Sequence, residues 1–264
     1  MSFLDKVDVL VLTYDEAPNI GRTLAAVSRF PEVVVLDSGS SDGTAEIVGS
    51  FPNARLLTHR FDGHASQWTH GLTACGLRRP WVLALDADYV LSPALVDEIS
   101  RLDPPATVAG YRSSFRYCIN GRPLSGTLYT PVVVLYRRAK AAYVQSGHTQ
   151  RVTIAGDIAD LKGRIDHDDR KPLARWLASQ QSYAKLEAEH LLRLPRSALR
   201  STDRIRLTGW AGPPLVFFYT LIWKRCIFDG WQGWFYVLQR TLAETMIALE
   251  LLEKRLGSGT RSKC

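Results

Sequence analysis

WVLALDAD, residues 81–88, is the most informative stretch of the chain. It contains five apolar residues followed by two aspartates that are separated by one alanine. The continuous apolar run from Trp81 to Leu85 is typical of a strand buried on both faces of a parallel sheet. Asp86 and Asp88 then lie at the mouth of that strand. Carboxylates suit a hard divalent cation such as Mg²⁺ or Mn²⁺, which often shares them with substrate phosphates. A D-x-D is common, so its meaning depends on the segments around it.

Segments that alternate between strand and helix patterns precede and follow this stretch. Two further buried strands are predicted at residues 7–12 and 33–36, and residues 54–58 are another strand candidate. Helical patterns are predicted at residues 20–28, 44–49 and 64–74, and another helix begins at Ser92-Pro93. Serine at the N-cap followed by proline in the first turn is a strong helix-start signal. The alternation predicts an α/β fold with a mostly parallel central sheet and helices on both faces.

Acidic residues follow three of the predicted strands, in Asp15-Glu16, in the loop 37–42 and in Asp86-Ala87-Asp88. In open α/β sheets ligands bind outside the carboxyl ends of the strands, so these side chains are expected to converge on one edge. The chain has neither a G-x-G-x-x-G after its first strand nor a Walker A loop, which excludes the common dinucleotide and P-loop sites. An acidic loop is better suited to a ribose hydroxyl or a base N–H than to a bare phosphate.

Three of these segments, residues 11–20, 34–44 and 85–88, together resemble the inverting family 2 glycosyltransferases of GT-A fold. Within that family the chain is most similar to the lipopolysaccharide-core β-glucosyltransferase group, through residues 62–67, 161–167 and 228–233. The resemblance implies a nucleotide-diphosphate sugar as the donor, with a UDP-sugar favoured, and inversion at the anomeric carbon. It also implies a hydroxyl of a cell-surface glycan or a lipid-linked molecule as the acceptor, and cell-envelope polysaccharide synthesis as the setting.

The resemblance assigns roles to particular side chains. Asp88 is placed in the catalytic site and holds Mg²⁺ or Mn²⁺, and His167 is a candidate further ligand that the C-terminal part of the fold brings back to the cation. The alternative for His167 is a simple polar turn in the segment 166–169. The implied donor-binding residues are Thr13, Glu16, Asp37, Gln67 and Asp86.

The general base is where this chain departs from its relatives. The related enzymes commonly carry a His-Glu pair ahead of a Val-rich strand, whereas the corresponding residues here are Thr149 and Gln150. Glutamine cannot accept a proton near neutral pH, so the neighbouring His148 is the predicted base, with Asp157 and Asp160 as further candidates. The alternative is a non-catalytic GT-A-like module that binds a nucleotide-sugar or a membrane and has lost its base.

The second half of the chain is predicted to be helical. We expect a GT-A domain over residues 1–170, a helical extension over 171–256 and a disordered tail over 257–264. Helices are predicted at 173–194 and 241–256, the latter after a Gly-rich turn at 229–233. Arginines at 193–206 precede an aromatic stretch that ends in Lys224-Arg225, so residues 193–225 are a candidate peripheral membrane contact. A buried helix or a homodimer contact are the alternatives.

Composition places the chain among ordinary globular proteins of a reducing compartment. Its 264 residues carry a net charge of +7, which suits an acidic partner such as a nucleotide-sugar or an anionic membrane. Nucleic acid is not expected, because charge alone favours it and no recognised motif supports it. The four cysteines are scattered, without C-x-x-C spacing. With no signal-peptide pattern at the start, the predicted location is the cytoplasm, including the inner face of its membrane.

Overall fold

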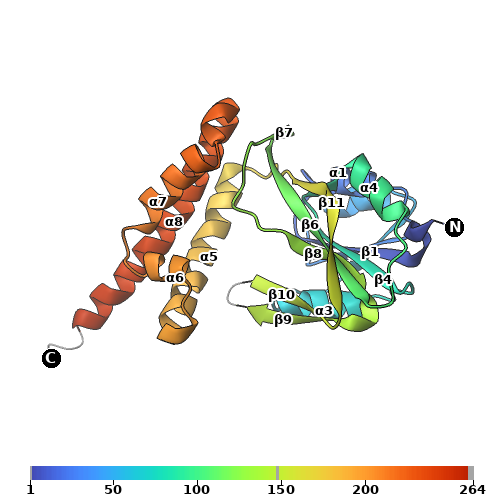
Figure 1. The fold of residues 1–264 in the computed structure, drawn as a ribbon, viewed down its shortest axis with the longest axis horizontal. Coiled ribbons are helices and arrows are strands. Elements are labelled where there is room, and N and C mark those ends of the chain that lie inside the picture. Colours follow the sequence, from blue (N-terminus) through green and yellow to red (C-terminus); the bar gives the residue numbers. More distant parts are fainter. Residues whose placement is uncertain (1, 147–148, 261–264) are drawn as a thin grey trace. The chain divides into compact units, whose positions relative to one another are not determined.

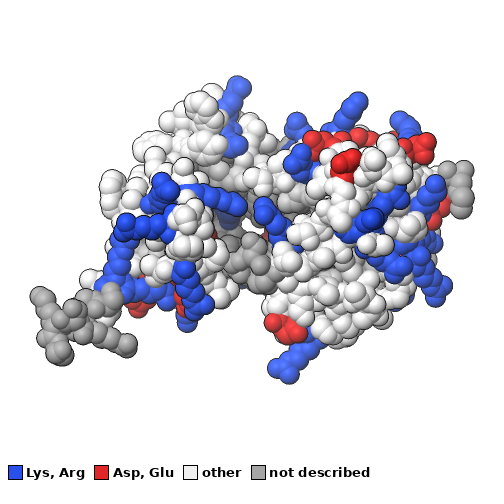
Figure 2. Space-filling view, turned by 60° about the horizontal axis from the view of Figure 1, so that its bottom comes forward, with Lys and Arg blue, Asp and Glu red and all other residues white. Residues whose placement is uncertain are grey.

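The computed structural model describes residues 2–146 and 149–260, and these divide into two compact units. The first unit comprises Met1–Pro123 and Tyr129–Lys171, and the second comprises Leu124–Leu128 together with the chain from Pro172 onward. The short segment Leu124–Leu128 therefore belongs with the helical unit, although the chain around it belongs to the first unit. Lys and Arg side chains are spread over the drawn face of both units (Figure 2).

A mixed sheet forms the centre of the first unit (Figure 1). Its strand order is β3-β2-β1-β4-β8-β6-β11-β5, with the short strand β7 paired to β6. A separate hairpin joins β9 (Ala141–Ser146) to β10 (Thr149–Ile154). The strands of the main sheet are β1 (Val7–Thr13), β2 (Val33–Asp37), β3 (Ala54–Thr58), β4 (Trp81–Asp86), β5 (Tyr89–Leu91), β6 (Val108–Ile119), β7 (Arg122–Pro123), β8 (Val132–Arg137) and β11 (Asp157–His167).

Helices cover both faces of the sheet, as predicted. Alternate residues of β1 point to opposite faces, which is the natural period of a strand. Val9 and Val11 pack with residues of α1 (Ile20–Ala26), α2 (Thr44–Gly49) and α4 (Pro93–Ser100). Leu10 packs on the other side with Trp68 and Leu72 of α3 (His64–Ala74). These two apolar layers hold the sheet between them, and the predicted fold class is confirmed.

Strand direction brings the carboxyl ends of several strands to one edge. β1 is parallel to both β2 and β4. β4 and β6 are each antiparallel to β8, so they run the same way, and β11 is parallel to β6. The last residues of β1, β2, β4 and β11 are Thr13, Asp37, Asp86 and His167. This edge is therefore the place where the candidate site is built.

The second unit consists of helices. They are α5 (Leu173–Arg193), α6 (Ser201–Arg206), α7 (Gly212–Phe218), the π-helix η4 (Tyr219–Trp223), the 3-10 helix η5 (Cys226–Asp229) and α8 (Gly230–Thr260). Three further 3-10 turns are η1 (Phe3–Lys6), η2 (Arg138–Lys140) and η3 (Arg196–Ala198). Among the described residues, none of the helices has the length and apolar character needed to cross a membrane.

Helix α8 is longer at both ends than the sequence predicts. The predicted Gly-rich turn lies largely inside it, because Gly233 is required for close packing and not for a turn: a Cβ there would lie 1.9 Å from the carbonyl oxygen of Cys226. Gly257, the predicted start of a disordered tail, also lies within α8. Its φ is not positive, so it does not end the helix. Residues 261–264 lie outside the described chain.

Candidate active site

Loops after β1 and β2 are tied together by short hydrogen bonds. The backbone N–H of Asp15 donates to Ser40 Oγ at 2.7 Å, and the N–H of Ser41 donates to Asp15 Oδ1 at 2.7 Å. The N–H of Glu16 donates to Thr44 Oγ1 at 2.8 Å. Asp15 has a positive φ of 49°, which a short polar side chain tolerates. Through these contacts Asp15 joins the two loops. Glu16 contributes only its backbone N–H here, so its side chain can make contacts at the sheet edge.

Asp37 is held within its own turn. Its Oδ2 accepts hydrogen bonds from the N–H groups of Gly39 and Ser40 at 2.9 and 2.8 Å, and its Oδ1 accepts one from the Ser40 hydroxyl. The residue is 5% exposed. These bonds are those of an Asp that shapes a Ser/Gly turn, and a contact with a nucleoside stays a prediction.

Gln67 and Thr13 lie at the same edge of the sheet, but they differ in the hydrogen bonding of their side chains. Gln67 is buried, and its Nε2 donates to Ser38 Oγ at 3.1 Å and to the carbonyl of His59 at 3.2 Å. It therefore fastens α3 to the loops after β2 and β3. Thr13 is also buried, but its Oγ1 finds no hydrogen-bond partner within the part of the chain that the structure describes. Because a buried hydroxyl without a partner is costly, Thr13 Oγ1 is a candidate ligand contact.

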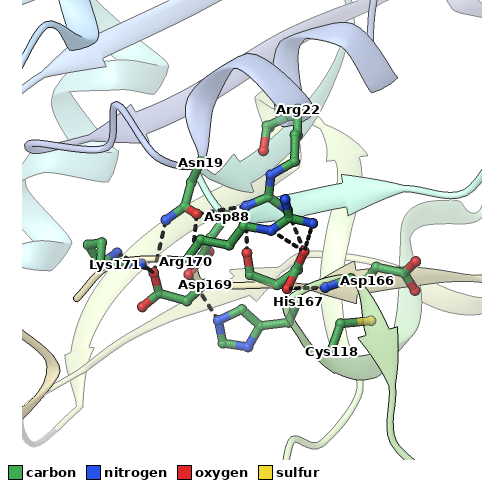
Figure 3. Close-up of polar contacts among 12 residues, drawn as sticks. Asn19, Arg22, Asp88, Cys118, Asp166, His167, Asp169, Arg170 and Lys171 are labelled. Carbon is green, nitrogen blue, oxygen red and sulfur yellow. Dashed lines mark hydrogen bonds and ion pairs between the residues drawn. The ribbon is translucent and has the colours of Figure 1, made fainter. Parts of the chain in front are cut away.

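The predicted pair Asp88 and His167 is brought together at the sheet edge (Figure 3). Asp88 lies in the turn between β4 and β5, and His167 is the last residue of β11. Their Oδ2 and Nε2 atoms are 3.0 Å apart, and both side chains are almost wholly buried. The antiparallel pairing of β5 with β11 sets Tyr89 opposite His167 and so fixes this contact. His167 therefore lies in a strand, and not in the simple polar turn that was the alternative for the segment 166–169.

Three tyrosine rings surround the imidazole of His167. The ring centroids of Tyr89, Tyr117 and Tyr129 lie 5.4, 4.9 and 4.5 Å from that of His167, each at a steep angle to it. This enclosure leaves the imidazole little freedom to rotate. Its Nδ1 is buried and has no hydrogen-bond partner among residues 2–146 and 149–260. The histidine is therefore oriented by packing and by Asp88.

The carboxylates of the D-x-D differ in their acidity. Burial alone would raise the pKa of Asp88, but the charge and hydrogen bond of His167, with help from Lys171, hold that pKa down to about 2. Burial and the neighbouring charge of Asp88 raise the pKa of Asp86 to about 6. Burial opposes protonation of His167, while the Asp88 carboxylate raises the pKa of that histidine. Asp88 is therefore the more acidic of the two carboxylates.

Residues 168–171, which follow His167, dock onto α1 (Figure 3). The guanidinium of Arg22 contacts Asp168 Oδ2 at 2.6 Å, and Arg170 contacts the same oxygen at 2.8 Å. Asn19, at the N-cap of α1, donates from Nδ2 to Glu16 Oε2 at 2.7 Å and to Asp169 Oδ1 at 2.9 Å. These contacts close the end of β11 onto the first loop and so hold His167 in place.

Lys171 is the cation of this cluster. Its Nζ lies 2.5 Å from Glu16 Oε1 and 3.3 Å from Asp169 Oδ1, with 15% of its side chain exposed. Burial opposes the charge, but Asp88, Glu16 and Asp169 raise the pKa of Lys171 above its usual value. Burial and the charge of Asp88 raise the pKa of Glu16 to about 7. Sequence reasoning missed Asn19, Arg22 and Lys171, and the charged run at 166–171 was the available signal.

The donors at Asp88 and His167 suit a divalent cation. Neighbouring ligands in an octahedral shell of radius about 2.1 Å stand about 3 Å apart, which is the separation observed between Asp88 Oδ2 and His167 Nε2. Carboxylate oxygen is a ligand that both Mg²⁺ and Mn²⁺ prefer, whereas imidazole nitrogen is a ligand typical of transition metals and not of Mg²⁺. Across the described residues no group of three or more His, Cys, Asp and Glu side chains gathers as a metal cage. Two protein ligands leave positions for water and for phosphate oxygens.

Of the candidate bases, the two aspartates do not join this cluster. His148 lies outside the described residues. Asp160 is exposed and paired with the guanidinium of Arg112 at 2.7 Å. Asp157 is the first residue of β11 and His167 the last, so at about 3.3 Å per residue most of the strand separates them. Neither aspartate is positioned to act beside Asp88.

Comparison with known proteins identifies the family. Residues 8–139 match the family model of glycosyl transferase family 2. The chain belongs to this family, and it is a glycosyltransferase. It is 26% identical over 243 residues to the lipopolysaccharide core biosynthesis glycosyltransferase LpsC of Rhizobium meliloti (strain 1021), covering 85% of this chain and 84% of that protein. It is 35% identical over 95 residues to an uncharacterized glycosyltransferase of Rickettsia bellii (strain RML369-C), which covers 36% of this chain and 31% of the relative.

Comparison with solved structures gives the following two superpositions. The crystal structure of S. aureus TarS 1-349 in complex with UDP-GlcNAc superposes with a TM-score of 0.47 at 15% identity, covering 96% of this chain and 92% of that one. GalNAc-T7 with UDP, GalNAc and Mn2+ superposes with a TM-score of 0.47 at 11% identity, covering 68% of this chain and 47% of that one.

Proposed function

We propose that this glycosyltransferase is metal-dependent and inverting, and that it moves a sugar from a nucleotide-diphosphate sugar to an acceptor hydroxyl. The single observation that carries the proposal is the contact between Asp88 Oδ2 and His167 Nε2 at the sheet edge, whose separation matches that of two neighbouring metal ligands. The favoured donor is a UDP-sugar. The acceptor is a cell-surface glycan or a lipid-linked molecule, which is in keeping with the role of the R. meliloti relative in lipopolysaccharide core biosynthesis.

Donor binding is assigned to residues that line the carboxyl edge. Thr13 supplies a hydroxyl that has no hydrogen-bond partner among the described residues, and Asp37 and Gln67 shape the loop that would face the nucleoside. Asp86 and Glu16 lie beside Asp88, and Lys171 brings a positive charge toward the same place. Mg²⁺ or Mn²⁺, held by Asp88 and His167, would offset the charge that develops on the leaving diphosphate. Lys171 would assist the same leaving group by its charge.

The acceptor hydroxyl must lose its proton as it attacks the anomeric carbon. We assign this role to His148, because a neutral imidazole accepts a proton near pH 7 and Gln150 cannot. A His148→Ala variant is expected to lose about 10²–10⁴-fold in transfer rate while its donor affinity is unchanged. His190→Ala, in the last turn of α5, is the matched control. Equal transfer rates in His148→Ala and wild type would remove His148 from the mechanism.

The proposed setting is the cytoplasmic face of a membrane that carries the acceptor. Residues 193–225, predicted from sequence as a peripheral membrane contact, are part of this proposal, and homodimer formation is its alternative. The aromatic residues of this stretch are largely exposed on α7 and η4, with Phe218, Tyr219 and Trp223 among them. This exposure disfavours the buried-helix alternative.

Calorimetric titration of a panel of nucleotide-diphosphate sugars, with and without Mn²⁺, tests the proposal. We expect one donor, a UDP-sugar, to bind in the presence of Mn²⁺ and to bind weakly without it. Binding that is indifferent to Mn²⁺ would overturn the metal assignment while keeping the donor site. Binding of no donor would favour the non-catalytic module, whose remaining activity would be tested with vesicles.

A further inference from the structure

An exposed aromatic surface covers one end of the helical unit. Its most exposed members are Trp231, Trp223 and Phe228, with 85%, 77% and 73% of each residue accessible. Large apolar residues exposed singly are normal, but a contiguous group marks a site of interaction with a protein or a membrane. The surface is defined by α7, η4, η5 and the first turns of α8, and its exposed apolar residues are Leu215, Phe218, Tyr219, Ile222, Trp223, Ile227, Phe228, Trp231, Phe235 and Leu238.

Two helical stripes build this surface and meet at the turn between η4 and η5. Leu215, Phe218 and Ile222 repeat at helical spacing along α7 and η4. Phe228, Trp231, Phe235 and Leu238 repeat in the same way into α8 and, like the first stripe, face away from the core of the unit. Arg225, between the stripes, has a φ of 61°, a conformation that costs energy for a residue with a side chain. The sharp turn it makes leaves Trp223 and Phe228 exposed at the tip.

Charge on this surface is of one sign. Asp229 is the single acidic residue between positions 207 and 238, and its carboxylate is buried against Ser125, accepting from the N–H at 2.8 Å and the hydroxyl at 2.6 Å. Lys224 and Arg225 are the cations of the same stretch. The Lys224 ammonium lies 5.5 Å from the Tyr219 ring centre, and the Arg225 guanidinium lies 5.7 Å from that of Phe228. Cations and aromatic rings are therefore interleaved.

One arginine of the run that precedes the surface is occupied inside the helical unit. Arg206 donates to Glu244 at 2.9 Å and to Glu187 at 3.0 Å. Arg193 lies 3.9 Å from Glu189, but 82% of its side chain is exposed. The arginines at positions 196, 200 and 204 are also exposed. Lys224 and Arg225 are the cations within the aromatic stretch itself, so we centre the candidate membrane contact on residues 215–238.

We propose that this surface, residues 215–238, docks on an anionic lipid membrane. Trp, Tyr and Phe rings beside Lys and Arg are the composition that enters the interfacial region of a bilayer, with the rings among the acyl chains and the cations at the headgroups. A second copy of the chain is a poorer occupant. In a two-fold dimer the same surface meets itself, and Lys224 and Arg225 would then face like charges without an exposed acid to offset them. The inference deepens the proposed membrane setting, and it holds whether or not the chain transfers a sugar.

Co-sedimentation of the full chain with vesicles tests the inference. Vesicles of phosphatidylcholine mixed with phosphatidylglycerol are expected to bind the protein, and vesicles of phosphatidylcholine alone are expected to bind it much less. Trp231→Ser and Leu238→Ser should weaken binding, whereas Leu186→Ser, an equally exposed leucine on α5, should not. Lys224→Gln should lower the partition coefficient about fivefold, since one cation near an anionic surface contributes that much. Lys185→Gln, on α5, is its control.

The outcomes are distinct. Loss of binding in Trp231→Ser and Leu238→Ser but not in Leu186→Ser supports the assigned surface. Equal loss in all three variants, or no binding to anionic vesicles, overturns it. A dimer in light scattering that Trp231→Ser dissociates, with no vesicle binding, would assign the surface to a second copy instead. Donor titration on the same variants should match wild type, so failure of the membrane inference is separate from failure of the donor site.

Discussion

Nε2 of His167 lies 3.0 Å from Oδ2 of Asp88, although 79 residues separate them in the chain. The contact joins the end of β11 to the turn that follows β4, and it depends on the pairing of β5 with β11. Any change that shifts β11 along its neighbours would therefore separate the two side chains. The position of β11 is as important to the site as the D-x-D itself.

His167→Ala is expected to weaken Mn²⁺ binding by at least about tenfold, because loss of a group that merely supports a metal ligand already costs that much. Electron paramagnetic resonance of free Mn²⁺ measures this directly. His190→Ala, on α5, is the control and should bind as wild type does. Unchanged Mn²⁺ affinity in His167→Ala would limit the role of this histidine to packing among the tyrosines.

Lys171→Met should weaken donor binding and also destabilise the fold. Its Nζ lies within ion-pair distance of Glu16 and Asp169, so the variant leaves two partly buried carboxylates without their cation, at a cost of about 1–3 kcal/mol. Urea unfolding gives the second effect and calorimetry the first. Lys171→Arg should recover part of both. Wild-type donor affinity in Lys171→Met would show that this lysine is purely structural.

Glu16 should make stability depend on pH between its usual pKa of 4.5 and about 7. The folded carboxyl binds its proton more tightly than the unfolded one, because it is buried and close to Asp88. Its stabilising contribution is therefore full below pH 4.5 and is lost as the pH rises through about 7. In urea unfolding, the free energy of unfolding of Glu16→Gln should fall by about 1–3 kcal/mol less than that of wild type over this pH range. Glu46→Gln, on α2, is the control and should have the same dependence of stability on pH as wild type. The same pH dependence in Glu16→Gln would show that Glu16 is not its source.

Gly163→Ala should disturb the position of β11. A Cβ at Gly163 would lie 2.7 Å from the Cα of Leu95, so α4 must move away from the strand. Overpacking of this kind costs about 1–3 kcal/mol. Gly49→Ala in α2 meets no atom within 4 Å and should be stabilising by about 0.5–1 kcal/mol. A lower melting temperature together with weaker Mn²⁺ binding in Gly163→Ala alone would link this packing to the site.

Local pattern was sufficient to predict the first half of the sheet. The strands at 7–12, 33–36 and 81–85 are short apolar runs with polar loops, and the structure has them as β1, β2 and β4. Ser92 caps α4 as predicted, accepting from the N–H of Leu95 at 3.2 Å. In these segments propensity, burial and loop chemistry favour the same result.

Long-range contacts were beyond the sequence. Nothing local shows that Asn19 bonds Asp169, 150 residues away, or that Lys171 reaches Glu16. The start of α8 was missed for a related reason. Gly230 and Gly233 signal a turn by composition, but the glycine at 233 is needed because the Cys226 carbonyl approaches the helix closely. Such an approach is decided by tertiary packing.

The role of Asp88 as a metal ligand is tested by calorimetric titration of UDP in the presence of Mn²⁺. The proteins compared are wild type, Asp88→Asn and Asp97→Asn. Asp97 is an exposed aspartate of α4 paired with Arg29, so its variant controls for loss of a carboxylate. We predict Mn²⁺-dependent binding of UDP to wild type and Asp97→Asn, and none to Asp88→Asn with its fold intact. Equal Mn²⁺-dependent binding to all three proteins would contradict the assignment of Asp88 as the metal ligand.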